Sequence, residues 1–255
     1  MSNPSNDPVT THGFTAVPAS AAALLTSTPE YPPPTTSAPP LSVSDIPIPK
    51  TPLASRIQTY ASEHLPAPTY NHSMRVYHFG LAIKHHRFPS WSFSDETYFL
   101  ACMLHDIGTT EENLRKTRLS FEFYGGMLAM EVLRDGEGGK GTGTGLLVAP
   151  VEQAESVAEA IIRHQDLCEV GKITAVGQLL QLATIFDNTG SYEDLVHPST
   201  IENVTAAFPR LKWANCFAAT IRQENGLKPW AHTTALGEEE FPAKVLGNKL
   251  MEKYE

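Results

Sequence analysis

Residues 98–109 read YFLACMLHDIGT, and this stretch is the most informative part of the chain. An apolar run from Tyr98 to Leu104 is followed directly by His105 and Asp106, and Gly108 then lets the backbone turn away. Two ionisable residues at the buried end of an apolar helix need a charged partner or a metal ion, because burying an unpaired charge is costly. The stretch therefore predicts a helix that delivers a histidine and an aspartate to a buried site.

Apolar residues recur at helical spacing through most of the chain after residue 50. Some of the expected helices begin at typical start signals, such as Thr51-Pro52 and Ser94-Asp95-Glu96. Helices are expected over residues 52–61, 69–88, 94–107, 121–134, 150–164, 176–188, 199–208 and 211–225. Because no alternating strand pattern is evident, the predicted fold class is all-α, a helical bundle.

The first 50 residues differ from the rest in composition, with eleven Pro, seven Ser and seven Thr. Such a stretch buries too little apolar area to offset its ordering entropy, so residues 1–50 are expected to be largely irregular. Residues 51–255 would form the catalytic domain. Within the N-terminal segment, residues 13–18 (GFTAVP) either dock on the core or belong to a free tail. Residues 136–145 hold six glycines and predict a flexible surface loop.

Charge and composition narrow the class of protein. The 255 residues include 19 Lys and Arg against 28 Asp and Glu, a formal net charge of −9. This acidic balance argues against a nucleic-acid partner, and no apolar run is long enough for a membrane span. Cys102, Cys168 and Cys216 are too few for a disulfide framework, and the N-terminus lacks the basic region of a secretory signal. We therefore expect a cytoplasmic protein.

Two further residues extend the site. His72 lies 33 residues before His105 inside an expected helix, and Asp187 follows the apolar run 179–186. Taken singly, His72 is either a hydrogen-bonded structural residue or a ligand, and Asp187 either a ligand or a helix cap. Together with Asp106, they offer two imidazoles and two carboxylates from three helices, a set that suits Zn, Fe or Mn.

The order His72, His105-Asp106, Asp187 resembles the HD-domain superfamily of metal-dependent hydrolases. A narrower resemblance is to the fungal cyanamide hydratases, which form urea. The strings that carry it are YNHSMRV (70–76), LHDIGT (104–109), SFEFYGG (120–126), EAIIRHQD (159–166), QLAT (181–184) with Asp187-Asn188, and KPWAHT (228–233). The match spans about residues 52–235, and residues 13–18 are also similar. The glycine loop and the Pro-rich start depart from the family pattern without touching these motifs.

The resemblance implies an HD-domain helical bundle with one catalytic Zn²⁺ ion. Fe²⁺ and Mn²⁺ are less favoured alternatives. Its ligands would be His72, His105, Asp106 and Asp187. Water activated by the zinc would attack the nitrile carbon of cyanamide, a small neutral substrate, to give urea. A homo-oligomer is compatible with this expectation.

Several other residues are candidates for handling protons or substrate. His164, at the end of an expected helix, is the first candidate for general acid or base, the alternative being a helix-end residue. Asn71 either contacts substrate or caps, Thr184 either contacts substrate or bonds back to its helix, and Glu122 either orients substrate or is solvated. Lys228, Trp230 and His232 either close the pocket or simply pack.

Two other functions fit parts of the pattern. An HD phosphohydrolase would use the same metal set, with Arg75 and Arg163 meeting a phosphate. A metal-retaining binding protein without turnover would be expected to lack a ligand, and none is missing here.

Overall fold

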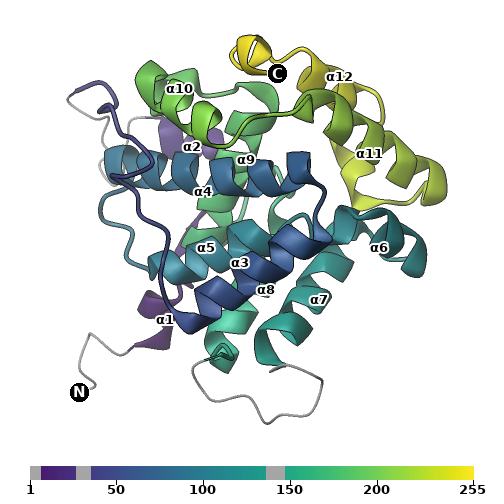
Figure 1. The fold of residues 1–255 in the computed structure, drawn as a ribbon, viewed down its shortest axis with the longest axis horizontal. Helices are drawn as coiled ribbons and strands as arrows, with labels where there is room; N and C mark the ends of the chain where they lie inside the picture. The colour runs from purple at the N-terminus through teal and green to yellow at the C-terminus, as the bar shows by residue number, and fades with distance from the viewer. Residues whose placement is uncertain (1–6, 27–35, 136–146) are drawn as a thin grey trace.

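The computed structural model describes residues 7–26, 36–135 and 147–255 (Figure 1). These residues form mostly helix, which confirms the predicted all-α class. The glycine-rich stretch 136–145 lies outside the described residues, and so do residues 31–35 of the Pro-rich segment.

The longer helices follow the predicted pattern closely. They are α3 (Pro52–His64), α4 (Ala67–Arg87), α5 (Asp95–Leu104), α7 (Phe121–Arg134), α8 (Val151–Arg163), α9 (Ala175–Thr189), α10 (Pro198–Ala207) and α11 (Trp213–Leu227). The sequence reading did not predict α1 (Pro8–Thr11), α2 (Ala21–Leu25), α6 (Glu111–Lys116) and α12 (Glu240–Leu246), nor the single turns η2 (Ile107–Thr109), η3 (Glu193–Leu195), η4 (His232–Leu236) and η5 (Glu252–Tyr254).

Local chemistry explains where the helices start and stop. The hydroxyl of Thr51 accepts a 3.0 Å hydrogen bond from Ala54 N at the start of α3, and Ser94 caps α5 in the same way. Thr174 caps α9, which ends at Gly190 in the left-handed conformation (φ 70°). Each cap satisfies a backbone group that the helix leaves unpaired.

Helices α4 and α9 form the centre of the molecule and pack directly against each other (Figure 1). Every residue of α9 from Ala175 to Asn188 is buried, as its apolar sequence predicted. Around this pair lie α5, α8, α10 and α11. A second apolar cluster fills the space between the end of α9 and helices α11 and α12. The central helices carry His72 and Asp187, so the packing brings these two residues into the interior.

The N-terminal segment docks on the helices. Strand β1 (Ala16–Pro18) pairs antiparallel with β2 (Lys172–Thr174), which places Val17 opposite Ile173. Val17 is only 1% exposed. Of the two alternatives for residues 13–18, the structure shows the docked one, and it contains a short two-stranded sheet that no alternating pattern in the sequence indicated. A domain boundary near residue 50 stays a prediction.

Among the described residues, none of the helices combines the length and the hydropathy needed to span a bilayer.

Candidate metal centre

His105 and Asp106 sit just beyond the end of α5, not inside a longer helix as expected. The helix stops at Leu104, and the chain passes through both residues into η2. His105 Nδ1 lies 2.8 Å from the carbonyl oxygen of Cys102, which can only accept, so Nδ1 carries a proton and the lone pair of the neutral imidazole is on Nε2. This is the arrangement in which a histidine presents Nε2 to a metal.

Gly108 is needed for a different reason than the sequence suggested. A Cβ atom at this position would lie 2.1 Å from the carbonyl oxygen of Phe121, at the start of α7. The glycine therefore permits a close approach between η2 and α7. This contact fixes the turn that carries Asp106 against the helix that carries Glu122.

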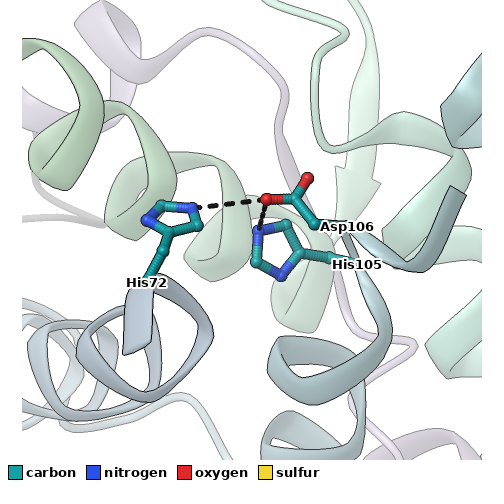
Figure 2. Close-up of side chains that lie close together, drawn as sticks. All are labelled: His72, His105 and Asp106. Carbon is teal, nitrogen blue, oxygen red and sulfur yellow. Dashed lines mark ion pairs between the residues drawn. The ribbon is translucent and has the colours of Figure 1, made fainter. Parts of the chain in front are cut away.

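Three side chains converge in the interior (Figure 2). Asp106 Oδ2 lies 3.2 Å from His105 Nε2 and 3.7 Å from His72 Nε2, which reaches in from α4. Ligand atoms of all three residues lie within 4.8 Å of one another, and each residue is at most 1% exposed. The structure thus brings together three of the four residues predicted as metal ligands.

The converging atoms lack other partners. His72 Nε2, His105 Nε2 and both carboxylate oxygens of Asp106 are buried and have no hydrogen-bond partner among the described residues. Buried polar atoms without partners are rare and destabilising, and each one needs an explanation. A divalent metal ion would use two imidazole lone pairs and a carboxylate that converge in this way. The residues present therefore fit the metal ion that the sequence predicted.

Ligation needs neutral imidazole and ionised carboxylate, and His72 and Asp106 have these states. Burial lowers the pKa of His72 to about 4, despite the opposing effect of Asp187. Burial alone would raise the pKa of Asp106, but His105 and His72 outweigh it and lower the pKa to about 2. At neutral pH His72 is therefore neutral and Asp106 is charged. Burial alone would lower the pKa of His105, but the nearby Asp106 carboxylate outweighs it and raises that pKa, so this imidazole must release its second proton to bind a metal ion.

Asp187 lies on the other side of the His72 ring from the three converging ligand atoms. Its Oδ2 lies 2.6 Å from His72 Nδ1, on the edge of the ring opposite Nε2. Arg75 Nη2 donates to Oδ2 at 2.9 Å, and Arg210 Nη1 donates to Oδ1 at 2.7 Å. These contacts make Asp187 a residue that orients His72. Its assignment as a direct ligand stays a prediction.

A small cavity opens beside the cluster. The centre of a water molecule can occupy a volume of about 10 Å³ inside it, so the cavity has room for about one water. Its lining contains the predicted residues His105, Asp106, His164 and Thr184, and also Gln165, Ile185, Asn188, Phe217, Leu236 and Phe241. The sequence did not predict this second group as site residues, because side chains from α9, α11, η4 and α12 meet only in the folded chain.

His164 lines this cavity with a free ring nitrogen. It is 2% exposed, and its Nδ1 lies 2.7 Å from the carbonyl oxygen of Ile161, so Nδ1 again carries the proton. Its ring meets that of His105 edge to face, with centroids 5.3 Å apart. Burial and the nearby His105 lower the pKa of His164, which keeps the imidazole neutral and able to accept a proton at Nε2.

Two side chains on one face of α9 offer hydrogen bonds of opposite sense. Thr184 donates its hydroxyl proton to Gln181 O at 3.0 Å, so its oxygen can only accept toward the cavity. Asn188 Oδ1 accepts a 2.8 Å hydrogen bond from Trp213 Nε1, which leaves the amide nitrogen as its free donor. The wall of the cavity therefore presents an acceptor and a donor one helical turn apart.

The other candidate residues lie outside the cavity lining. Asn71 lies on a different face of α4 from His72, and its amide nitrogen donates a 2.8 Å hydrogen bond to Pro209 O. Glu122 is fully buried and accepts a 3.2 Å hydrogen bond from Thr233. His232 lies 3.5 Å from Glu122 and 3.0 Å from Asp166.

Of the two alternatives for Lys228 and Trp230, the structure favours packing, because neither residue lines the cavity. Lys228 is buried and donates to Leu119 O at 2.7 Å, while Trp230 is 61% exposed and donates to Arg118 O at 3.0 Å. Leu236 and Phe241 line the cavity instead.

The two arginines considered for phosphate binding are already engaged. Arg75 is fully buried, and its donors contact Asp187 and the carbonyl oxygens of Phe208 and Pro209. Arg163 donates to Asp166 at 3.0 Å and to Lys172 O at 3.1 Å. Neither residue lines the cavity, which removes the observation that favoured a phosphohydrolase.

Comparison with known proteins agrees with this geometry. Residues 69–189 match the HD domain family. The chain is 43% identical over 203 residues to each of two Saccharomyces cerevisiae proteins, cyanamide hydratase DDI2 and cyanamide hydratase DDI3. The matched region covers 80% of this chain and 85% of each relative. With an HD domain, this identity and a buried cluster of two histidines and an aspartate, the chain belongs to the cyanamide hydratase family.

Proposed function

We propose that this chain hydrates cyanamide to urea at a metal ion held by His72, His105 and Asp106. The observation that carries the proposal is the convergence of their unpartnered ligand atoms beside a cavity of about one water's size, in a chain 43% identical to two cyanamide hydratases. A cavity this small favours the smallest substrates, and cyanamide, with three heavy atoms, would need only a slight widening of it. A nucleotide would require several lining side chains to move.

We take Zn²⁺ as the ion, because the site has borderline imidazole ligands with a carboxylate and no thiolate. Fe²⁺ and Mn²⁺ are the alternatives. When bound, such an ion supplies a Lewis acid that favours the ionisation of water near neutral pH.

The reaction adds one water across the nitrile. The water oxygen bonds to the nitrile carbon, one carbon–nitrogen π bond breaks, and the nitrile nitrogen takes up a proton. The isourea then tautomerises to urea. His164 Nε2 accepts the proton that the water loses and returns it to the nitrile nitrogen, so no net proton is consumed.

The two polar side chains of α9 would orient the substrate. Cyanamide has an acceptor at its nitrile end and N–H donors at its amino end, matching the donor of Asn188 and the acceptor of Thr184. Because Trp213 fixes the Asn188 amide, its nitrogen is a preformed donor for the negative charge that would develop on the nitrile nitrogen. A preorganised donor of this kind stabilises the transition state more than the ground state.

The test is direct. The purified chain is loaded with Zn²⁺ and incubated with cyanamide, and urea is measured with and without a chelator. A parallel panel measures phosphate release from nucleotides. We expect urea formation that the chelator abolishes, and no phosphate release. Phosphate release without urea formation would replace the proposal with a phosphohydrolase.

A further inference from the structure

Glu255, which follows η5, contacts the side chain of Arg210 and the first turn of α11. Its Oε1 accepts a 2.7 Å hydrogen bond from Arg210 Nε, and its Oε2 accepts a 3.3 Å hydrogen bond from Ala214 N. The side chain is 23% exposed, whereas the Arg210 side chain is fully buried. A residue near the surface is thus bonded to the interior of the molecule.

The first contact leads to the edge of the His72 ring. Arg210 Nη1 donates to Asp187 Oδ1 at 2.7 Å, and Asp187 Oδ2 lies 2.6 Å from His72 Nδ1. Asp187 and His72 are fully buried. Charged hydrogen bonds therefore run without a break from Glu255 to the candidate ligand.

The second contact leads to the face of the same ring. Leu211 and Lys212 adopt left-handed backbone angles (φ 52° and 61°), and Lys212 gives α11 no side-chain cap. The Glu255 carboxylate takes that place, accepting from Ala214 N, where a negative charge also favours the helix N-terminus. Next to Ala214, Trp213 stacks on His72, with ring centroids 4.2 Å apart and planes 14° apart.

Charge adds to the geometry. The buried guanidinium groups of Arg75 and Arg210 are balanced by the carboxylates of Asp187 and Glu255. Removing the charge of Glu255 leaves this group of four side chains with one excess positive charge. That excess would repel a divalent cation through a poorly screening interior.

We propose that Glu255 is a positioning residue of the metal centre, which fixes His72 through Arg210 and Asp187 at its edge and through α11 and Trp213 at its face. The inference rests on the metal site of the proposed function but is independent of the substrate. Outer residues that orient ligands commonly change metal affinity by about 10–100-fold when replaced.

The experiment measures Zn²⁺ affinity by competition with a chromogenic chelator, on the full-length chain and below the unfolding temperature of every variant. The variants are Glu255→Gln, which keeps an acceptor but loses the charge, and Glu255→Ala. Glu252 supplies matched controls, Glu252→Gln and Glu252→Ala, because it lies in the same segment, is 66% exposed and pairs only with Lys249 among the described residues.

We expect Glu255→Ala to weaken Zn²⁺ binding by about 10-fold or more, and Glu255→Gln to weaken it less. Both Glu252 variants should keep the wild-type affinity. A purely structural role would lower the unfolding temperature without changing the affinity, so equal Zn²⁺ affinities in all five proteins would overturn the inference while leaving the proposed function intact. A wild-type chain that binds no Zn²⁺ would contradict both.

Discussion

The carboxylate of Asp187 lies 2.6 Å from Nδ1 of His72, and this contact turns the other ring nitrogen, Nε2, toward Asp106. Carboxylates commonly hold metal-binding histidines in this way, fixing both the ring and its tautomer. Asp187 in turn is held by two buried arginines, Arg75 and Arg210. The position of one candidate ligand thus depends on a network that extends well beyond the metal centre.

Replacing Asp187 should therefore damage both metal binding and folding. Asp187→Asn keeps the shape but leaves two buried arginines without their shared counter-charge. We expect a loss of about 3–5 kcal/mol in the free energy of unfolding and of about 10–100-fold in Zn²⁺ affinity. Denaturation and chelator competition measure these quantities, with the exposed Asp194→Asn as control. Wild-type Zn²⁺ affinity in Asp187→Asn would show that this carboxylate neither orients His72 nor binds the ion.

Asn188 tests the orientation of the substrate. Asn188→Asp keeps the acceptor for Trp213 and replaces the amide donor by a carboxylate oxygen. We expect kcat for urea formation to fall by about 10²–10³-fold while Zn²⁺ stays bound, as when a donor to developing charge is removed. Asn203→Asp is the control, because that exposed amide also accepts through its oxygen, from Val43 N at 2.8 Å. An unchanged kcat in Asn188→Asp would mean that the donor plays no part.

His78 should make the stability of the metal-free chain depend on pH. It is 1% exposed, neither ring nitrogen has a hydrogen-bond partner among the described residues, and burial lowers its pKa to about 4. Below pH 6.5 the unfolded chain binds a proton that folded His78 does not. Stability therefore falls as the pH drops toward 4, by about 2 kcal/mol from this residue at pH 5.

Guanidinium denaturation at pH 8 and pH 5 measures the effect of His78. In His78→Phe, which keeps a ring against Phe208, the fall in stability should be smaller by that amount. His72, whose pKa is also lowered to about 4, should account for part of what remains. The exposed His85→Phe should behave like the wild type, and an equal fall in stability in His78→Phe would contradict the assignment.

The sequence predicted those parts of the fold that local signals specify. The stop at Pro89 and the apolar run 179–186 led to predictions of α4 and α9 that are correct to within two residues at either end, and α7 was predicted with its observed bounds. The pairing of β1 with β2 was missed because each strand has only three residues, too few to show an alternating pattern. The two strands also lie far apart in the sequence, with Val17 opposite Ile173. Short helices such as α6 and α12 carry too few turns for a periodic pattern.

The candidate site also contains residues that the sequence predicted and residues that it did not. His72, His105 and Asp106 were predicted from the order of a motif along the chain, and the structure brings them together. The contact of Asp187 with the far edge of His72, and the positions of Arg210 and Glu255, depend on side-chain directions set by tertiary packing. Arg210 and Glu255 are 45 residues apart and belong to no recognisable motif.

The most direct measurement compares metal content per chain with the rate of urea formation, on the same samples of wild type, His105→Ala, Asp106→Ala and His164→Ala. We expect His105→Ala and Asp106→Ala to lose both metal and activity. His164→Ala should keep its metal and form urea about 10²–10⁴-fold more slowly, as expected when a general acid or base is removed. Full metal content and wild-type urea formation in His105→Ala or Asp106→Ala would contradict the metal centre, and loss of metal in His164→Ala would make that residue a ligand.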